Sequence, residues 1–299
     1  MEKEHSRRKM VSVIIPTLNA ENEINNLIEK LNNQTVKPDE IIIIDSESED
    51  NTVEKCMGVK NVHCKTIERS QFDHGRTRDM ALKDCIGDYV VFMTQDAIPY
   101  NEFLIENLID SFNINDQIAI VTARQIPKDD ACLYEKRIRE YNYPNRSFIR
   151  TQNDIEKLGI KAFFSSDVCC AYKKDIYLKC GGFDYPIKTN EDMFMAAKIL
   201  NNGYSIMYCA NAMVHHSHNF TLIQQYKRNY IQGYEIAKHG YLLGKSSLTG
   251  EGLNLVRFVG KSLLLEGHIM CLIRFAFDCM ARFIGNRSGR KAYEKSDSV

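Results

Sequence analysis

Between residues 10 and 123 the chain alternates short apolar, β-branched runs with longer segments that repeat apolar residues at helical spacing. The short runs predict buried strands, and the segments between them predict amphipathic helices. Strands that alternate with helices form a mostly parallel sheet, because each helix carries the chain back along one face of the sheet. The strands are expected at 10–16, 40–45, 62–68, 88–94 and 117–123, and the helices at 20–34, 48–58, 75–85 and 101–113.

The same pattern divides the chain into regions. The alternation indicates a Rossmann-like α/β half, and beyond residue 124 it fades. There "FFSSDVCCAYKKDIYLKCGGFD" predicts a strand, a turn and a short helix, and "TNEDMFMAAKILNNGY" predicts a helix with Thr189 or Asn190 as its N-cap. The expected organisation is a tail over 1–9, an α/β domain over 10–240 with halves 10–123 and 124–240, and a helical extension over 241–299.

The extension interleaves large apolar residues with basic ones, in "LNLVRFVGKSLLLEGHIMCLIRFAFDCMARFIGNRSGRK". None of its uncharged apolar stretches approaches the roughly 20 residues that a spanning helix needs. We therefore predict basic amphipathic helices. Such helices suit the surface of an anionic bilayer and also suit packing against the preceding domain, and the sequence leaves both interpretations open.

The composition excludes some partners and compartments. Lys and Arg total 39 and Asp and Glu total 39, so a net charge of zero offers no general attraction to nucleic acid. The ten cysteines include no C-x-x-C pair, which favours buried thiols in a reducing compartment. The basic N-terminus is followed by an apolar run that Pro16 interrupts too early for a signal peptide. We expect a cytoplasmic protein that binds no nucleic acid.

Polar segments follow the expected strands, in "PTLN", "DSES", "QFDHG" and "TQDAIP". Parallel strands end at one edge of a sheet, so these segments should converge on the crevice where such folds bind ligands. The first loop, "IIPTLNAEN", contains no glycine. A dinucleotide-binding oxidoreductase needs G-x-G-x-x-G there, and a nucleotidyltransferase needs a loop rich in glycine and lysine, so the sequence argues against both.

Three polar clusters are candidates for chemistry. Asp96 follows an apolar strand, where a carboxylate either caps the next helix or binds a ligand, and Asn101 is better placed as the cap. Glu191 and Asp192 begin a helix whose dipole stabilises carboxylates, so capping and a functional role are both open. "VHHSHNF" groups imidazoles after a strand, which suits a metal or a diphosphate. Zinc is disfavoured because no cysteine lies nearby.

These motifs, in this order, resemble a family 2 glycosyltransferase with a GT-A fold. The resemblance covers residues 10–240 and runs through "VSVIIPTLNAENEINNLIEKLNNQ", "DEIIIIDSESEDNT", "FMTQDAIP" and "NED". Asp96 falls on the last acid of the family's D-x-D motif, and "NED" matches its acid-rich catalytic motif. Within the family, "QFDHGRTRDMAL", "MTQDAIP" and "VHHSHNFT" are most similar to bacterial rhamnosyltransferases that build O-antigen or capsular polysaccharide.

The resemblance implies a nucleotide-sugar donor and a divalent cation, Mg²⁺ or Mn²⁺, that neutralises the leaving diphosphate. Asp96 would be a ligand of the cation, and His216 a second ligand to the metal or the phosphate. Thr94 and Gln95 occupy the first two positions of the D-x-D motif, so metal affinity should be low without the nucleotide. The residues implied in nucleotide-sugar binding are Pro16, Thr17, Asn19, Glu21, Asp45, Gly75, Arg78, Gln95 and Asp96.

The resemblance also implies transfer with inversion at the sugar carbon. Asp192 would be the base that takes the proton of the acceptor hydroxyl, and Glu191 would support or orient the acceptor. Repulsion between adjacent carboxylates raises the pKa of one of them, which makes it a better base. Asp167, His218 and Arg228 are expected on the acceptor side of the site or on a lid over the donor.

The donor that the resemblance favours is dTDP-rhamnose. The acceptor is expected to be a saccharide or lipid-linked saccharide at the inner face of the membrane, which the basic extension would contact. A UDP-sugar is the alternative donor, because uracil and thymine differ by one methyl group. A catalytically degenerate binding module is a third possibility, since the D-x-D motif is reduced to one acid, although the retained Asp192 and His216 count against it.

Overall fold

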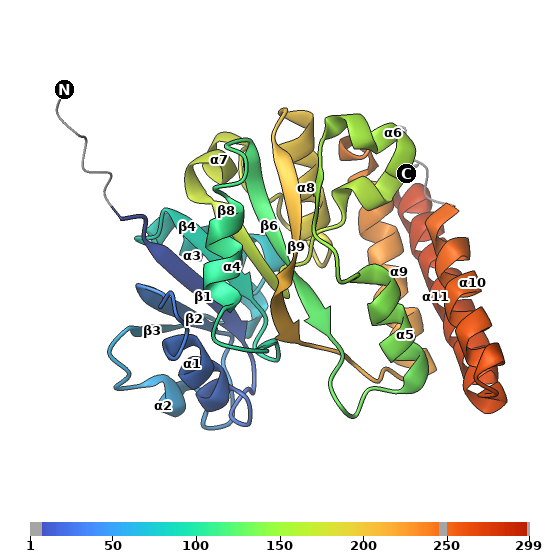
Figure 1. Cartoon of the computed structure of the whole chain (residues 1–299), viewed down its shortest axis with the longest axis horizontal. Coiled ribbons are helices and arrows are strands. Elements are labelled where there is room, and N and C mark those ends of the chain that lie inside the picture. Colours follow the sequence, from blue (N-terminus) through green and yellow to red (C-terminus); the bar gives the residue numbers. More distant parts are fainter. Residues whose placement is uncertain (1–7, 245–249, 298–299) are drawn as a thin grey trace.

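The computed structural model describes residues 8–244 and 250–297, so most of the expected N-terminal tail lies outside the described residues. One twisted sheet runs through the molecule and helices cover both of its faces (Figure 1). The strands are β1 (Val11–Thr17), β2 (Glu40–Asp45), β3 (Val62–Thr66), β4 (Tyr89–Met93), β5 (Ile98–Pro99), β6 (Ile118–Ile126), β7 (Phe148–Arg150), β8 (Cys169–Lys173) and β9 (Ser205–His215). The helices are α1 (Ile24–Asn32), α2 (Thr52–Cys56), α3 (His74–Asp84), α4 (Leu104–Ser111), α5 (Leu133–Asn142), α6 (Ile155–Leu158), α7 (Lys174–Lys179), α8 (Glu191–Asn201), α9 (Leu222–Lys238), α10 (Gly250–Leu265) and α11 (Ile269–Asp297).

The order of the sheet is β3-β2-β1-β4-β8-β6-β9-β5, with β7 paired to β9. β1 pairs in parallel with β2 and β4, and β3 extends this parallel half beyond β2. All the strands and helices expected between residues 10 and 123 are present, and their ends differ from the expected bounds by a few residues. The predicted α/β class is therefore confirmed.

The second half of the sheet mixes strand directions. β8 runs antiparallel to both β4 and β6, whereas β6 and β9 pair in parallel. β9 spans 11 residues and also carries β5 and β7 as antiparallel neighbours. Because Ile98 of β5 pairs with His215 of β9, the turn that leaves β4 is held beside the end of β9.

Apolar layers cover both faces of the sheet. On one face, Val11, Val13 and Ile15 pack with the buried sides of α1 and α4. On the other face, Ile14 packs with residues of α3, α7 and α8. Successive side chains of a strand point to opposite faces, so a strand buried on both faces reads as a continuous apolar run. The two layers hold the strands in place, and the polar loops at the carboxyl ends of the strands remain accessible.

The C-terminal extension is a hairpin of α10 and α11 at the edge of the molecule farthest from β3 (Figure 1). α11 packs along α9 at close range because glycines face the backbone of α9: a Cβ on Gly285 or Gly289 would overlap the carbonyl oxygen of Tyr226 or Tyr230. Tyr134 of α5 joins an apolar cluster with both helices of the hairpin. The hairpin thus packs against the α/β domain. Within residues 8–244 and 250–297, no helix has both the length and the apolar character to cross a bilayer.

Replacing Gly289 with alanine should destabilise the protein. The new Cβ would overlap the Tyr230 carbonyl, so α9 and α11 would have to separate. Overpacking of this kind costs roughly 1–3 kcal/mol, which urea unfolding will measure. Gly260→Ala is the matched control, because a Cβ there meets only Leu272 Cδ1 at 3.8 Å and alanine is favoured in helices by about 1 kcal/mol. Equal stability of the Gly289→Ala and wild-type proteins would contradict the close packing.

Candidate active site

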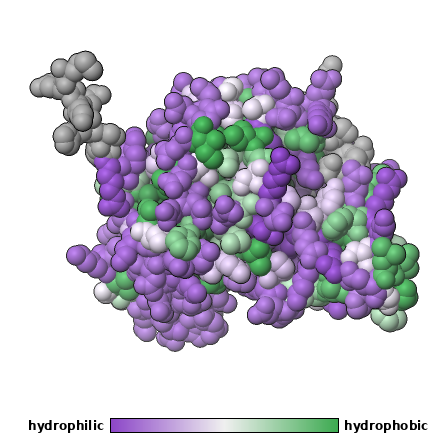
Figure 2. All heavy atoms as spheres, in the orientation of Figure 1, coloured by the Kyte–Doolittle hydropathy of each residue, from purple (hydrophilic) through white to green (hydrophobic). Residues whose placement is uncertain are grey.

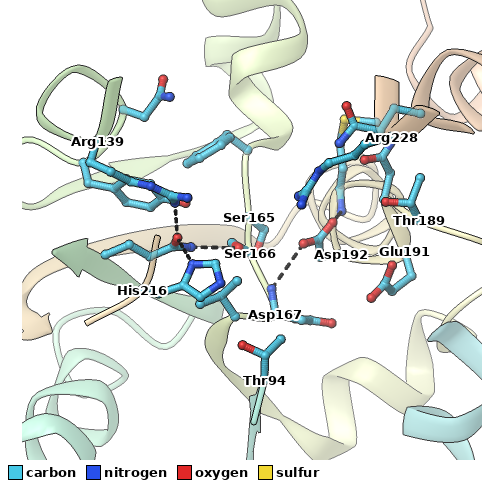
Figure 3. A pocket seen from close by; sticks show the side chains of 18 of the residues that line it. Thr94, Arg139, Ser165, Ser166, Asp167, Thr189, Glu191, Asp192, His216 and Arg228 are labelled. Atoms are coloured by element: carbon cyan, nitrogen blue, oxygen red, sulfur yellow. Dashed lines mark hydrogen bonds between the residues drawn. The ribbon is translucent and has the colours of Figure 1, made fainter. Parts of the chain in front are cut away.

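A cavity of about 590 Å³ opens at the carboxyl ends of the strands, among residues of α3, α5, α8 and α9. Arg139 and His216 lie on one side of it and Glu191 and Asp192 on the other, with Asp167 between them (Figure 3). The cavity therefore gathers cationic, imidazole and carboxylate groups from both halves of the sheet. The predicted residues that line it are Arg78, Asp96, Asp167, Glu191, Asp192, His216, His218 and Arg228.

Asp96 forms a cluster with two histidines. A carboxylate oxygen of Asp96 and one ring nitrogen each of His216 and His218 lie within 4.8 Å of one another. Asp96 Oδ2 is 3.4 Å from the Nε2 atom of each ring. One carboxylate and two imidazoles that converge in this way fit a divalent cation. This cluster groups His218 with Asp96 and His216, the two predicted ligands, whereas the resemblance predicts His218 among the acceptor or lid residues.

The sheet explains why these side chains meet. Asp96 lies in the turn between β4 and β5, and His216 directly follows β9, so the pairing of β5 with β9 sets them side by side. The alternative role of Asp96 as a helix cap is not observed. The predicted cap by Asn101 is not observed either, because the N-cap position of α4 is Phe103 and no side chain makes a capping bond there. Asn101 Oδ1 instead accepts a 3.1 Å hydrogen bond from the N–H of Phe103 in the turn before the helix. The Asp96 carboxylate is left to face the histidines.

Burial keeps the two imidazoles uncharged at neutral pH. Loss of hydration lowers the pKa of His216, and it lowers the pKa of His218 to about 4. A charged ring is costly away from water, so both rings are neutral at pH 7. Neutral imidazole is the form that binds metals.

Arg78 organises the opposite side of the cavity. This arginine is buried in α3, and its guanidinium lies 3.3 Å from Glu191 Oε1 and 3.9 Å from Asp167 Oδ2. It also donates a 3.0 Å hydrogen bond to the carbonyl of His74. One buried cation thus offsets part of the negative charge of several carboxylates.

Asp192 lies in the first turn of α8. Its Oδ1 accepts a 2.7 Å hydrogen bond from the N–H of Met193, and its Oδ2 accepts one of 3.2 Å from the N–H of Asp167. Burial, and then repulsion by Glu191, nevertheless raise the pKa of Asp192 to about 7. The backbone donors hold the carboxylate in place, and its environment makes it able to accept a proton near neutral pH.

The segment before β8 supports this arrangement. Asp167 is buried, and its Oδ1 accepts a 2.7 Å hydrogen bond from the hydroxyl of Tyr172. Burial and the neighbouring Asp192 raise the pKa of Asp167 well above its ordinary value. The N-cap position of α8 is Asn190, as predicted, with a left-handed φ of 66° and no capping bond from its side chain. The helix start is therefore shaped by the backbone, and its carboxylates face the cavity.

Some of the residues predicted to bind the nucleotide sugar form a second cluster, which does not line this cavity: Pro16, Thr17, Asn19, Glu21, Asp45 and Gln95. Asp45 is fully buried at the end of β2, and its carboxylate accepts hydrogen bonds from Thr17 Oγ1 at 3.0 Å and from the N–H of Ser48 at 2.8 Å. The side-chain amide of Gln95 bonds to both the N–H and the carbonyl of Leu18, at 2.8 and 3.1 Å. These contacts fasten the first loop to its neighbours.

The other predicted residues of this second cluster have similar roles. Asn19 adopts a φ of 51°, and its Oδ1 accepts a 2.9 Å hydrogen bond from the N–H of Glu49. Glu21 accepts bonds from the N–H and the side-chain amide of Asn51, at 3.1 and 3.0 Å. Pro16 lies within β1. The loops after β1 and β2 are thus tied together, and contact of these residues with a nucleotide stays a prediction.

Gly75 and Arg228 are explained by different features. A Cβ on Gly75 would lie 2.6 Å from the carbonyl oxygen of Asp184, so packing at the start of α3 requires a glycine there. Contact of Gly75 with a nucleotide stays a prediction.

Arg228 lies on α9 with its guanidinium 5.2 Å from the ring centre of Phe220. Burial and the nearby Arg139 lower the pKa of Arg228. In the described part of the chain no carboxylate pairs with Arg228, which leaves it available to an anion.

Gln125 and Arg139 are among the residues that line the cavity and that the sequence did not predict. Gln125 lies near the end of β6, two residues beyond the expected strand over 117–123. A polar residue at the carboxyl end of an apolar strand is the signal that singled out Asp96, and it would have found Gln125 too. Arg139 is one of several charged residues on α5. Only the packing of α5 turns it toward the cavity.

The model of the family described as Glycosyl transferase family 2 matches residues 12–181. The O-antigen chain rhamnosyltransferase RfbN of Salmonella typhimurium is 36% identical over 283 residues, which cover 94% of this chain and 89% of the relative. The O-antigen chain rhamnosyltransferase WbaN of Salmonella anatum is also 36% identical over 283 residues, which cover 93% of this chain and 89% of the relative.

Solved structures share the architecture. The mannosyltransferase PcManGT of Pyrobaculum calidifontis, in complex with GDP-Man and Mn²⁺, has a TM-score of 0.62 at 16% identity, over 94% of this chain and 88% of that one. Residues 1–349 of TarS from S. aureus, in complex with UDP-GlcNAc, have a TM-score of 0.56 at 17% identity, over 95% of this chain and 92% of that one. These likenesses confirm the predicted GT-A fold.

Proposed function

The chain belongs to glycosyl transferase family 2 and is a glycosyltransferase, and on that premise we propose that it transfers L-rhamnose from dTDP-rhamnose to a saccharide of the bacterial cell surface. The observation that carries the proposal is the extent of the likeness to two relatives named as O-antigen chain rhamnosyltransferases, which covers almost the whole chain. Residues 10–240 would form the GT-A domain, with the donor bound mainly by 10–123 and the acceptor by 124–240, and 241–299 would be its extension.

Asp96, His216 and His218 would hold a divalent cation, Mn²⁺ or Mg²⁺. Bound there, the cation would neutralise the diphosphate that leaves as the bond from the sugar carbon to its phosphate oxygen breaks. Two imidazole ligands favour Mn²⁺ over Mg²⁺, which prefers oxygen ligands. With one acid in the D-x-D motif, the affinity for metal should stay modest until the nucleotide contributes its own oxygens.

Asp192 is the residue that we assign as the base. A hydroxyl of the acceptor would give its proton to Asp192 as the hydroxyl oxygen attacks C1 of the sugar, and the bond to the diphosphate breaks on the opposite face, so the configuration inverts. A pKa of about 7 suits this task, because half of the carboxyl is ionised at that pH and the carboxylate is still a stronger base than an ordinary aspartate. Glu191 and Asp167 would position the hydroxyls of the acceptor.

Arg228 would meet the leaving diphosphate. Its guanidinium lines the cavity and is desolvated, and such a group gains more from an anionic ligand than an exposed one does. Arg78, in contrast, is already occupied by Glu191 and Asp167, so its part in donor binding would be indirect. The base and ribose would lie along the loops after β1 and β2, where Thr17, Asn19 and Asp45 and their neighbours are predicted to act.

The acceptor is proposed to be lipid-linked, at the inner face of the membrane, with the hairpin resting on the bilayer. The turn of the hairpin exposes Leu265 by 75% and Met270 by 78%. Apolar surface gathers at the lower right of Figure 2, where Figure 1 places this turn. Exposed Lys261 and Arg274 lie beside it, which suits an anionic surface. Further exposed apolar residues continue along α11: Ile269, Ile273, Phe277, Met280, Phe283 and Ile284.

The donor proposal predicts that dTDP-rhamnose with Mn²⁺ stabilises the protein against thermal unfolding. At about 100 times its dissociation constant the ligand should add roughly 2.7 kcal/mol. Asp96→Asn should lose the part of the shift that depends on Mn²⁺, whereas Asp129→Asn, at an exposed position, should keep it. A larger shift with a UDP-sugar would indicate that the UDP-sugar, and not dTDP-rhamnose, is the donor. No shift with any nucleotide sugar would instead favour the degenerate binding module.

The base assignment predicts that Asp192→Asn lowers turnover at least about 100-fold and spares donor binding. In the wild-type enzyme kcat/KM should rise with pH through about 7, because only ionised Asp192 accepts the proton. The folded-state pKa lies above the ordinary 3.8, so ionisation lowers stability as the pH rises between these values. The free energy of unfolding of Asp192→Asn, relative to that of the wild-type protein, should therefore be higher at pH 8 than at pH 4. Full turnover by the variant would exclude Asp192 as the base.

The membrane proposal predicts that the paired change Leu265→Asp and Met270→Asp abolishes flotation with vesicles that contain phosphatidylglycerol. Two carboxylates would be placed where apolar side chains enter the headgroup region. Met57→Asp is the matched control, because Met57 is 67% exposed on the nucleotide half. Flotation of the double variant at the wild-type level would refute contact through the turn, and equal binding to phosphatidylcholine vesicles would refute the role of charge.

A further inference from the structure

Gln125 contacts His216 at the ring nitrogen that does not face Asp96. The distance from Gln125 Oε1 to His216 Nδ1 is 2.9 Å, and His216 is 5% exposed. The same Oε1 accepts a hydrogen bond from Nη1 of Arg139 (Figure 3). Gln125 Nε2 donates to Ser166 Oγ at 3.0 Å. Every polar atom of this buried amide is therefore engaged.

These contacts determine which way the amide of Gln125 points. A guanidinium only donates hydrogen bonds, so the atom that Arg139 touches must be the amide oxygen. Arg139 is itself held in place, because its Nε donates a 2.9 Å hydrogen bond to Glu135 Oε1 on the preceding turn of α5. Its guanidinium also lies 5.7 Å from the ring centre of Tyr143. The amide cannot rotate by half a turn without placing its NH₂ group against a fixed cation.

The orientation of the amide in turn decides where His216 carries its proton. An amide oxygen only accepts, so Nδ1 must be protonated, whether the ring is neutral or charged. In the neutral ring Nε2 then keeps its lone pair, and this is the atom that lies 3.4 Å from Asp96 Oδ2. With the opposite tautomer, the lone pair of Nδ1 would face the oxygen of Gln125 at 2.9 Å, which is closer than the 3.4 Å that separates Nε2 from Asp96 Oδ2 and leaves no room for a cation between Nδ1 and that oxygen.

We propose that Arg139 and Gln125 are positioning residues that lock His216 in the tautomer whose Nε2 lone pair points at Asp96 and can bind a cation. The inference rests on the proposed metal site and deepens it, since it names the residues that prepare one ligand for the metal. Removing the residue that hydrogen-bonds the other ring nitrogen of a metal-binding histidine commonly weakens metal affinity 10–100-fold, and we expect roughly this effect here. α5, which carries Arg139, packs on the C-terminal hairpin through Tyr134 and Ile138, so the hairpin also supports the lock.

The first test measures the tautomer without any metal. In protein labelled with ¹⁵N-histidine, NMR should show the His216 ring with a protonated Nδ1 and a bare Nε2, assigned by the signals lost in His216→Gln. Gln125→Leu should shift the ring toward a mixture of tautomers. Gln125→Glu keeps an acceptor at the same place and should keep the tautomer. Gln117→Leu, at an exposed position just before β6, is the matched control.

The second test measures the affinity for Mn²⁺ alone by electron paramagnetic resonance. We expect Gln125→Leu to weaken binding at least about tenfold, and Gln125→Glu and Gln117→Leu to stay near wild type. If Gln125→Leu fails to fold, Arg139→Met replaces it, because loss of the guanidinium frees the amide to rotate. An unchanged tautomer and affinity in the Gln125→Leu or Arg139→Met protein overturns the inference. A wild-type protein that binds no Mn²⁺, either alone or with dTDP added to supply diphosphate oxygens, refutes the proposed metal site instead, and the NMR result still decides the position of the proton.

Discussion

The pairing of β5 with β9 is the constraint on which the rest of the site depends. β5 has only two residues, yet its bonds to β9 set the turn that carries Asp96 beside His216 and His218. β9 is itself held between β6 and its antiparallel neighbours, so the cluster stands at the end of a strand with support on both sides. Without this short ladder the same side chains would belong to separate loops. Ligands carried by strand ends are presented with less conformational freedom than ligands on loops.

The second constraint is the cost of buried charge on the other side of the cavity. Arg78 offsets part of the negative charge of Asp167 and Glu191, but burial still raises the pKa of Asp167 and of Asp192. A carboxyl whose folded-state pKa is raised contributes most to stability below its unfolded pKa, and this contribution is lost as the pH rises through the folded value. The fold thus gives up some stability near neutral pH for carboxylates that can take up a proton there.

Local patterns were enough to predict the parts of the site that stand at the ends of regular elements. Asp96 follows an apolar strand, Asp192 begins a helix, and His216 follows another strand, and each of them lines the cavity. Gln125 and Arg139 were not predicted, because their importance lies in a contact between β6, α5 and the end of β9. The loop residues around Asp45 were predicted from the resemblance to contact a nucleotide, and their side chains join the loops to one another.

The sequence by itself determined the α/β class and the parallel half of the sheet, because the spacing of apolar residues encodes strands and helices. It also determined the family, because the chain carries motifs that resemble those of the family in the same order. The tertiary structure alone decided which polar groups meet. The insertion of β8 as an antiparallel strand between β4 and β6 has no periodic signal in the chain. The contact of α11 with α9 through glycines has no periodic signal either, because it depends on how closely the two helix backbones approach each other. Contacts between distant residues follow from the order of the sheet and the docking of helices, and these are set by packing of the whole chain.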